Sequence, residues 1–194
     1  HESHCACSFY QSSFDDCVTI SFDGGGDDGV FNFYQCSKDR GIKRFEYNCD
    51  INLGHAYMLL CYPISEIKDQ KGSLPRNLAL AGKMMGLVAY GKVRDEWLPH
   101  FVNFYKSTGS WNLNTLGREI GLRLSINTLS GQLSYDFAAT AQRAFEQIFF
   151  EVVDDFEHKF GKMDDICLSG GSALNVLLNE LLIKKNRLSK GKVF

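Results

Sequence analysis

The spacing of hydrophobic residues changes within the first 50 positions. It is helical at the start of the chain and alternating, as in a strand, further on. Residues 1–12 place small and aromatic side chains at helical spacing and predict a helix. The run CVTISF (17–22) is β-branched and apolar, which predicts a buried strand. VFNFYQC (30–36) and IKRFEYN (42–48) alternate and predict two further antiparallel strands, joined by SKDRG.

The strongest periodic signal is an amphipathic helix over residues 134–161. Ser134 or Asp136 is expected to cap its N-terminus, and Gly161 to end it. Its apolar face is formed by residues that repeat at spacings of three and four: Phe137, Ala141, Phe145, Ile148, Phe149, Val152 and Phe156.

The middle of the chain is less regular. LGHAYMLLCY (53–62) has a helical pattern until the following proline stops it. NLALAGKMMGLVAYG (77–91) predicts a short helix that runs into a glycine-bounded turn. Residues 95–107 predict another helix despite Pro99, and residues 109–133 are expected to be irregular.

Composition narrows the class of protein. A length of 194 residues, with 44% hydrophobic and 13% aromatic residues, predicts a soluble globular chain of one domain. The formal charge of -2 shows no excess of basic residues, so nucleic acid is not the expected partner. We expect no membrane span, because no run approaches the roughly 18 apolar residues that one needs. The seven cysteines form no CxxC pair and predict reduced, mostly buried thiols in a cytoplasmic protein.

Two glycine-rich turns follow predicted strands. The first, DGGGDDG (23–29), places Asp23 at the end of a strand, where its carboxylate could hold a cation. Gly24, Gly25 and Gly26 could then admit phosphate oxygens close to the backbone. The alternative is a flexible hairpin tip between two strands.

The second turn, LSGGSALN (168–175), lies between the short predicted strand ICL and a predicted helix over 173–185. Gly170 and Gly171 would let the backbone approach a ligand, and the helix N-terminus would offer N–H groups to an anion. Asn175 is expected one turn inside this helix. The alternative is a tight strand-to-helix turn. A strand, a glycine turn and a helix in succession are typical of α/β proteins.

Two further stretches carry candidate chemistry. Lys83 lies among small residues in AGKMMGLVAYG, where it could pair with a phosphate or a carbamoyl-type oxygen. It could equally be a lysine whose charged end reaches out of a buried helix. HESH places His1 and His4 three residues apart on one helix face, a spacing that can serve a metal.

In order along the chain, these stretches resemble the transferase domain of nodulation- and antibiotic-type O-carbamoyltransferases. The resemblance rests on HESHCACSFYQSSFDDCVTISFDGGGD, LGHAYMLL, AGKMMGLVAYG, DFAATAQRAFEQ and LSGGSALNVLLNE. That domain is similar to the tRNA threonylcarbamoyl-transfer enzymes. The resemblance implies an actin-like, sugar-kinase-like ATPase fold, here an incomplete one without its first strand region and its C-terminal part.

The resemblance also implies a chemistry. Carbamoyl-adenylate, made from carbamoyl phosphate and ATP in a C-terminal adenylate-forming domain, would bind beside a divalent metal, expected to be iron. The carbamoyl group would then pass to a hydroxyl of a sugar-like or antibiotic-like small acceptor. Residues 1–194 would be a fragment of the transferase domain, inactive alone. A non-catalytic nucleotide-binding module of the same fold is the alternative, and a purely structural domain is a third reading.

The resemblance assigns the site residues. His4, aligned on HCACSF, matches a metal-ligand histidine of the family, and Asp23 matches a metal-binding aspartate. His1 is then not the ligand, because the family's other histidine lies one position before it. A further metal aspartate would follow Phe194. Asp27 and Asp28 are expected to be solvated loop acids.

Two departures affect the central motif. The family commonly has glutamate where this chain has Ala81 and proline where it has Ala89. Losing the acid at Ala81 leaves that motif's polar contacts in question. Cys5 and Cys7 also replace small residues of the family pattern. No residue of the chain is assigned as the general base.

Overall fold

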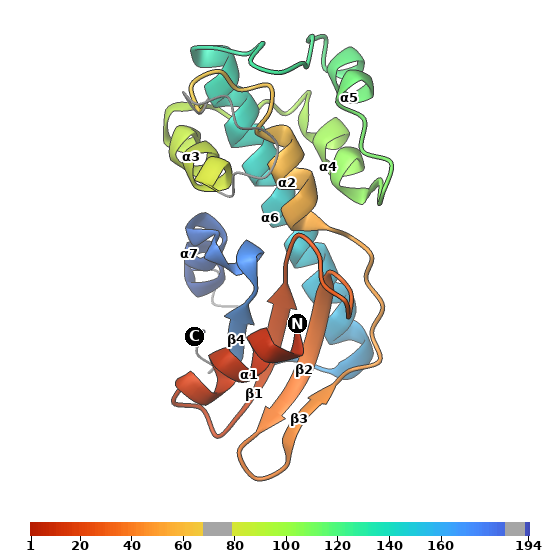
Figure 1. Cartoon of the computed structure of the whole chain (residues 1–194), viewed down its shortest axis with the longest axis vertical. Helices are drawn as coiled ribbons and strands as arrows, with labels where there is room; N and C mark the ends of the chain where they lie inside the picture. Colours follow the sequence, from red (N-terminus) through yellow and green to blue (C-terminus); the bar gives the residue numbers. More distant parts are fainter. Residues whose placement is uncertain (68–78, 185–192) are drawn as a thin grey trace. The chain divides into compact units, whose positions relative to one another are not determined.

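The computed structural model describes residues 1–67, 79–184 and 193–194. These residues form two compact units (Figure 1). Unit 1 consists of His1–Gly54 and Phe150–Phe194, and unit 2 consists of His55–Phe149. The chain therefore enters unit 1 twice, first with its N-terminal strands and again with its C-terminal segment.

Unit 1 is built on a four-stranded mixed sheet with the order β3-β2-β1-β4. The strands are β1 (Asp16–Phe22), β2 (Phe31–Ser37), β3 (Gly41–Arg44) and β4 (Ile166–Ser169). β1 pairs antiparallel with β2, and β2 with β3, whereas β1 and β4 run parallel. The α/β class is thereby confirmed, and the actin-like fold stays a prediction.

The face of the sheet under α1 (Glu2–Gln11) carries small, polar and thiol side chains. In β1 these are Cys17, Thr19 and Ser21, which share this face because side chains alternate along a strand. Their cross-strand partners in β2 are Cys36, Tyr34 and Asn32, so this face also carries one large aromatic side chain. α1 packs on this face over β1 and β4 (Figure 1).

The opposite face is aromatic. Phe31 and Phe33 of β2 lie there, both about 1% exposed. Phe33 stacks on Phe156 of α6 (Gln132–Phe160), with ring centroids 3.8 Å apart and planes within 5°. The contact buries the faces of two large apolar rings, and aromatic side chains contribute much of the free energy gained from burial in a core. The long predicted helix therefore covers the sheet with the face that its periodicity indicated.

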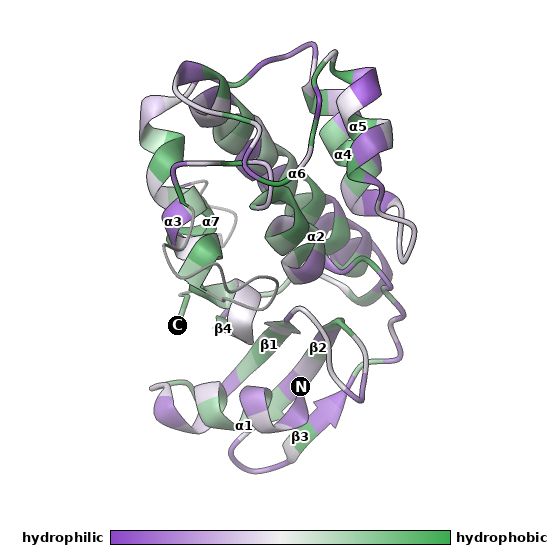
Figure 2. Cartoon of the chain, turned by 45° about the horizontal axis from the view of Figure 1, so that its top comes forward, coloured by the Kyte–Doolittle hydropathy of each residue, from purple (hydrophilic) through white to green (hydrophobic). Residues whose placement is uncertain are grey.

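The predicted strand over 42–48 is shorter than expected, because β3 ends at Arg44. Phe45 still donates its N–H to the carbonyl of Phe33, but the ring of Phe45 then meets Phe156 of α6 at 5.0 Å. Phe45 therefore keeps one hydrogen bond to the sheet while its ring contacts the helix. Figure 2 shows the end of β3 in hydrophilic purple, as the exposed Lys43 and Arg44 require.

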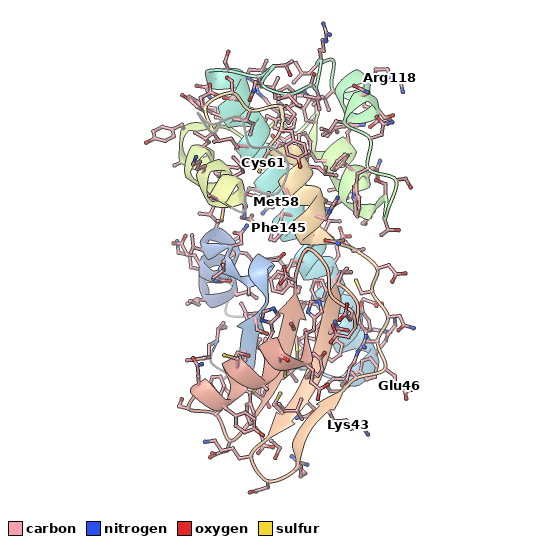
Figure 3. The ribbon with its side chains drawn as sticks, viewed as in Figure 1. Lys43, Glu46, Met58, Cys61, Arg118 and Phe145 are labelled. Carbon is pink, nitrogen blue, oxygen red and sulfur yellow. The ribbon has the colours of Figure 1, made fainter. Side chains whose placement is uncertain are left out.

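Unit 2 is helical. It contains most of α2 (Leu53–Leu60), then α3 (Ala79–Leu87), α4 (Leu98–Lys106) and α5 (Leu113–Glu119). It also holds the first part of α6. Figure 3 shows Met58 and Cys61 on the α2 side of its core and Phe145 on α6. The contact between the two helices includes Tyr57, whose ring lies 5.4 Å from that of Phe145.

Two predictions about helices in unit 2 are corrected. α4 begins at Leu98, so Pro99 occupies its first turn, where proline is compatible with a helix. α5 lies within the stretch that was expected to be irregular. Its N-cap is Asn112, whose side chain accepts hydrogen bonds from the N–H groups of Asn114 and Thr115.

α6 begins at Gln132, so neither Ser134 nor Asp136 caps it. Asp136 instead holds a neighbouring segment. It is about 1% exposed and accepts hydrogen bonds from the Lys92 N–H at 2.8 Å and from Arg94 Nε at 2.7 Å. Gln132 also donates to it. A typical capping residue is thus used for a tertiary contact.

We expect Asp136 to make the stability of the chain pH-dependent in acid. Burial acts to raise the pKa of Asp136, but the hydrogen bonds from Lys92, Gln132 and Arg94 together lower it. A lowered carboxyl pKa stabilises the fold above the unfolded value of about 3.9, and this contribution is lost as the pH falls further. Urea titrations between pH 7 and pH 3 should show this loss in the wild type and a smaller one in Asp136→Asn.

The exposed Asp39 supplies the control, because Asp39→Asn removes a carboxylate that lies in a turn. This variant should keep the wild-type pH dependence. Equal losses of stability in acid for the wild type and Asp136→Asn would show that the buried carboxylate is not responsible.

None of the helices within the described ranges is both long and apolar enough to cross a membrane. All seven cysteines are free thiols, and five of them are buried, as the sequence predicted: Cys5, Cys17, Cys36, Cys61 and Cys167. The cytoplasmic location stays a prediction.

Candidate functional site

The two glycine-rich turns meet in unit 1. β1 and β4 are parallel neighbours, so their carboxyl ends lie at the same edge of the sheet. β1 is followed by Asp23 and β4 by Gly170. The N–H of Gly171 donates a hydrogen bond to Asp23 Oδ2 at 2.9 Å, across 148 positions of sequence. In open α/β sheets, ligands bind at the carboxyl ends of such strands.

Gly170 and Gly171 are required by this close approach. Gly170 has φ of 91° and ψ of 164°, a backbone conformation restricted to glycine. A Cβ at Gly170 would lie 2.3 Å from the carbonyl oxygen of Phe22. A Cβ at Gly171 would lie 2.7 Å from Asp23 Oδ1. The glycine turn therefore fits directly against the end of β1.

Residues 23–30 form a hairpin connection between β1 and β2. The N–H of Asp23 donates to the carbonyl of Val30 at 3.1 Å and closes the loop. Gly24, Gly25 and Gly26 are exposed at its tip. The hairpin interpretation is thus confirmed, and it does not exclude a ligand, because the same exposed backbone can face one. The role of these glycines in phosphate binding stays a prediction.

Asp23 also lies next to His4 of α1. His4 Nε2 is 3.5 Å from Asp23 Oδ2, with His4 55% and Asp23 30% exposed at their side chains. The N–H of Gly24 donates to Asp23 Oδ1 at 2.6 Å. The structure therefore brings the two predicted metal ligands together at the point where the turns meet.

His1 is occupied elsewhere. Its Nδ1 is hydrogen-bonded to Ser21 Oγ at 2.8 Å, and its Nε2 to the carbonyl of Gly29 at 3.0 Å. Its ring also packs against Gly26, where a Cβ would lie 2.9 Å from it. With both ring nitrogens in hydrogen bonds, His1 fits a positioning role under the loop better than a metal-ligand role.

The His4 imidazole and the Asp23 carboxylate could hold a metal ion only together with further ligands. Imidazole nitrogen and carboxylate oxygen suit iron, manganese or zinc. His4 and Asp23 supply one of each. Across the described part of the chain, however, no group of three or more His, Cys, Asp or Glu side chains is arranged to hold a metal ion.

Asn175 is placed differently from the prediction. Gly171–Leu174 form a short 3-10 turn, η2, and α7 (Val176–Lys184) begins only after Asn175. The Asn175 side chain is about 5% exposed, and its Oδ1 accepts a hydrogen bond from the N–H of Leu178. Asn175 is therefore the N-cap of α7, not a residue one turn inside it. Its proposed contact with a nucleotide stays a prediction.

Lys83 lies on α3, where it is exposed. It belongs to unit 2, whereas the two turns belong to unit 1. This exposure agrees with the alternative interpretation, in which the ammonium group of Lys83 reaches from the helix into solvent. Its proposed contact with a phosphate or carbamoyl oxygen stays a prediction.

Asn52 and Gly54 support the site and were not predicted. Asn52 Nδ2 donates to the carbonyl of Gly24 at 2.9 Å and thereby holds the hairpin tip. A Cβ at Gly54 would lie 2.6 Å from Ser172 Oγ and 2.8 Å from the nitrogen of Gly24. The start of α2 thus packs between the two turns. The sequence did offer one signal, because Gly54 stands at the start of a predicted helix, where glycine is unfavourable unless another segment packs closely.

Asp28 is not a solvated loop acid. Its carboxylate accepts hydrogen bonds from the backbone nitrogens of His1 at 2.9 Å and Glu2 at 3.2 Å, at the start of α1. Tyr34 Oη donates to it at 3.1 Å. A carboxylate at a helix N-terminus stabilises that helix. The loop that carries Asp23 therefore also fixes the helix that carries His4.

The chain is similar to two curated proteins over nearly its whole length. Uncharacterized protein sll1178 of Synechocystis sp. is 23% identical over 96% of this chain, and uncharacterized protein MJ1051 of Methanocaldococcus jannaschii is 28% identical over 97%. The chain spans 32% and 36% of their lengths, about a third. Residues 1–190 match the family described as carbamoyltransferase N-terminus. The chain therefore belongs to the carbamoyltransferase N-terminus family.

Proposed function

We propose that this chain is part of an O-carbamoyltransferase and binds carbamoyl-adenylate at the edge of the sheet in unit 1. Membership of the carbamoyltransferase N-terminus family supports a role in carbamoyl transfer. The observation that carries the site is the hydrogen bond from Gly171 to Asp23, which joins two exposed glycine turns at the ends of parallel strands.

The backbone of the two turns would bind the phosphate of the adenylate. The N–H of Gly24 already donates to Asp23, so the N–H groups of Gly25 and Gly26 on the exposed loop tip would face the phosphate. Gly170 and Gly171 let this turn lie directly against Asp23 and the end of β1, and their backbone would face the ligand from there. Such N–H groups stabilise negative charge on a phosphate that leaves as the carbamoyl group is transferred. Lys83 would supply a further positive charge to a phosphate or carbamoyl oxygen.

His4 and Asp23 would contribute to a site for a divalent metal, iron in our proposal. When bound, the metal would act as a Lewis acid toward the carbamoyl or phosphate oxygens. The remaining ligands would be a histidine and an aspartate outside residues 1–194, as the family resemblance implies. The adenylate would come from a C-terminal adenylate-forming domain that uses carbamoyl phosphate and ATP. The acceptor would be a sugar-like or antibiotic-like hydroxyl compound.

A non-catalytic nucleotide-binding module is the alternative. The observation that favours it is the small number of metal-binding side chains in the described part of the site, where His4 and Asp23 form a pair and not a larger group. In that case the glycine turns would bind a nucleotide, and its affinity would not depend on a metal.

Binding of AMP to the full-length protein, which would supply the remaining metal ligands, separates these functions when it is measured by calorimetry with and without Mn²⁺. AMP stands for the adenylate, and Mn²⁺ is a redox-stable substitute for Fe²⁺ with similar ligand preferences. We expect AMP to bind roughly tenfold more tightly when Mn²⁺ is present, a change of about 1.4 kcal/mol. Binding that is unchanged by Mn²⁺ would favour the nucleotide-binding module. Absence of AMP binding under both conditions would contradict both functions.

A further inference from the structure

Four buried thiols lie together under α1, within unit 1. They are Cys5 of α1, Cys17 of β1, Cys36 of β2 and Cys167 of β4, each at most 5% exposed. They belong to one hydrophobic cluster with Phe9, Phe14 and Tyr34. Neither the carbamoyl-transfer proposal nor the nucleotide site uses these sulfurs, so they need a separate account.

The sulfurs form two close pairs. Cys5 Sγ lies 3.4 Å from Cys36 Sγ, and Cys17 Sγ lies 3.6 Å from Cys167 Sγ. Thr19 Oγ1 is 3.3 Å from Cys36 Sγ and 3.9 Å from Cys17 Sγ, so it lies between the pairs. A disulfide needs the sulfurs about 2.05 Å apart, which requires a movement of roughly 1.4 Å for the closer pair.

We propose that Cys5 and Cys36 are an oxidisable pair, which a hydroperoxide converts to a disulfide that fastens α1 to β2. The structural elements distinguish this pair from Cys17 and Cys167. β1 and β4 are held side by side by the ladder that pairs Thr19 with Cys167. α1 rests on the sheet through side chains such as Phe9, so it can shift without breaking a ladder.

The reaction balances with a hydroperoxide as the oxidant. One thiol sulfur attacks the O–O bond, becomes a sulfenic acid and releases one water when the oxidant is hydrogen peroxide. The second thiol then displaces hydroxide from the sulfenic sulfur, and the S–S bond forms with release of a second water. Two thiols are oxidised by two electrons, and one peroxide is reduced to two waters.

Access to the pair would come from local opening of α1. This helix has 10 residues and packs against the sheet with one face, on which Cys5 and Phe9 are buried. Short elements with few buried side chains open at a lower free energy than the whole fold. The disulfide would then hold α1, and His4 with it, against the sheet.

The test treats the native protein with hydrogen peroxide, alkylates the remaining thiols after denaturation and maps the peptides by mass spectrometry. We expect a cross-linked Cys5–Cys36 peptide and a loss of alkylation at Cys5 and Cys36, both reversed by dithiothreitol. The melting temperature of the oxidised protein should rise by about 5 °C or more.

Two variants provide the comparison. Cys36→Ser should remove both the cross-link and the rise in melting temperature. Cys61→Ser should keep both, because Cys61 is the single cysteine of unit 2 and burial raises the pKa of its thiol to about 12. The proposal is overturned if Cys5 and Cys36 of the wild type stay alkylated once the exposed Cys7 is oxidised, or if the mapped cross-link joins Cys17 to Cys167.

Discussion

Replacing Gly170 with alanine is expected to lower the free energy of unfolding of the chain by about 3 kcal/mol or more. Two effects add. The conformation at Gly170, with φ of 91° and ψ of 164°, strains any residue that has a side chain. The new Cβ would also lie 2.3 Å from the oxygen and 2.9 Å from the carbon of the Phe22 carbonyl. Those are backbone atoms of β1, so they cannot rotate away.

Gly161→Ala is the matched control. Gly161 has φ of 94°, close to that of Gly170, but no atom lies within 4 Å of the position of its Cβ. It should therefore show only the cost of a positive φ, about 1 kcal/mol. Urea unfolding followed by circular dichroism measures both variants. If the two lost equal stability, the close approach of the glycine turn to β1 would not be what constrains Gly170.

Replacing Asp23 with asparagine is expected to weaken the Mn²⁺-dependent binding of AMP by at least ~10-fold, since losing even an outer partner of a metal costs about that much. The amide keeps the size of the carboxylate but only one of its two acceptor oxygens, so it loses the hydrogen bond from either Gly24 or Gly171 and keeps the other. It removes the negative charge that a divalent cation needs. The fold should therefore be retained while the metal-dependent part of the affinity is lost.

Asp27→Asn provides the matched charge change in the same loop. Asp27 is exposed at the hairpin tip, four positions from Asp23. This variant should bind AMP and Mn²⁺ like the wild type, and urea midpoints confirm that both variants are folded. Wild-type affinity for AMP and Mn²⁺ in Asp23→Asn would contradict the assignment of Asp23 to the metal site.

The elements with a strong period could be predicted from the sequence. α6 was found because its apolar residues repeat over many turns, and β1 because it is short, apolar and β-branched. α5 was missed, since it is a seven-residue helix in a stretch with mixed polarity. The start of α6 was placed too late because Ser134 and Asp136 have the composition of a cap. Asp136 is used to hold Arg94, and local sequence does not report such a contact.

The site was predicted in part. The order of the motifs along the chain led to the carbamoyltransferase family, and with it to His4 and Asp23. The sequence could not show that Gly171 bonds to Asp23, because 148 positions separate them and only the pairing of β1 with β4 brings them together. Asn52 and Gly54 were missed for the same reason, since their partners in the turns are distant in sequence.

The thiol-bearing face of the sheet has a consequence for the site at its edge. Side-chain volume on that face sets the distance between α1 and the strands, because the helix rests on it. A bulkier residue at Cys17 or Thr19 would push α1 away from the strands. The 3.5 Å separation of His4 and Asp23 would then widen. The side chains beneath α1 thus set the height of the helix above the sheet, and the geometry of the site depends on their volume as well as on its own side chains.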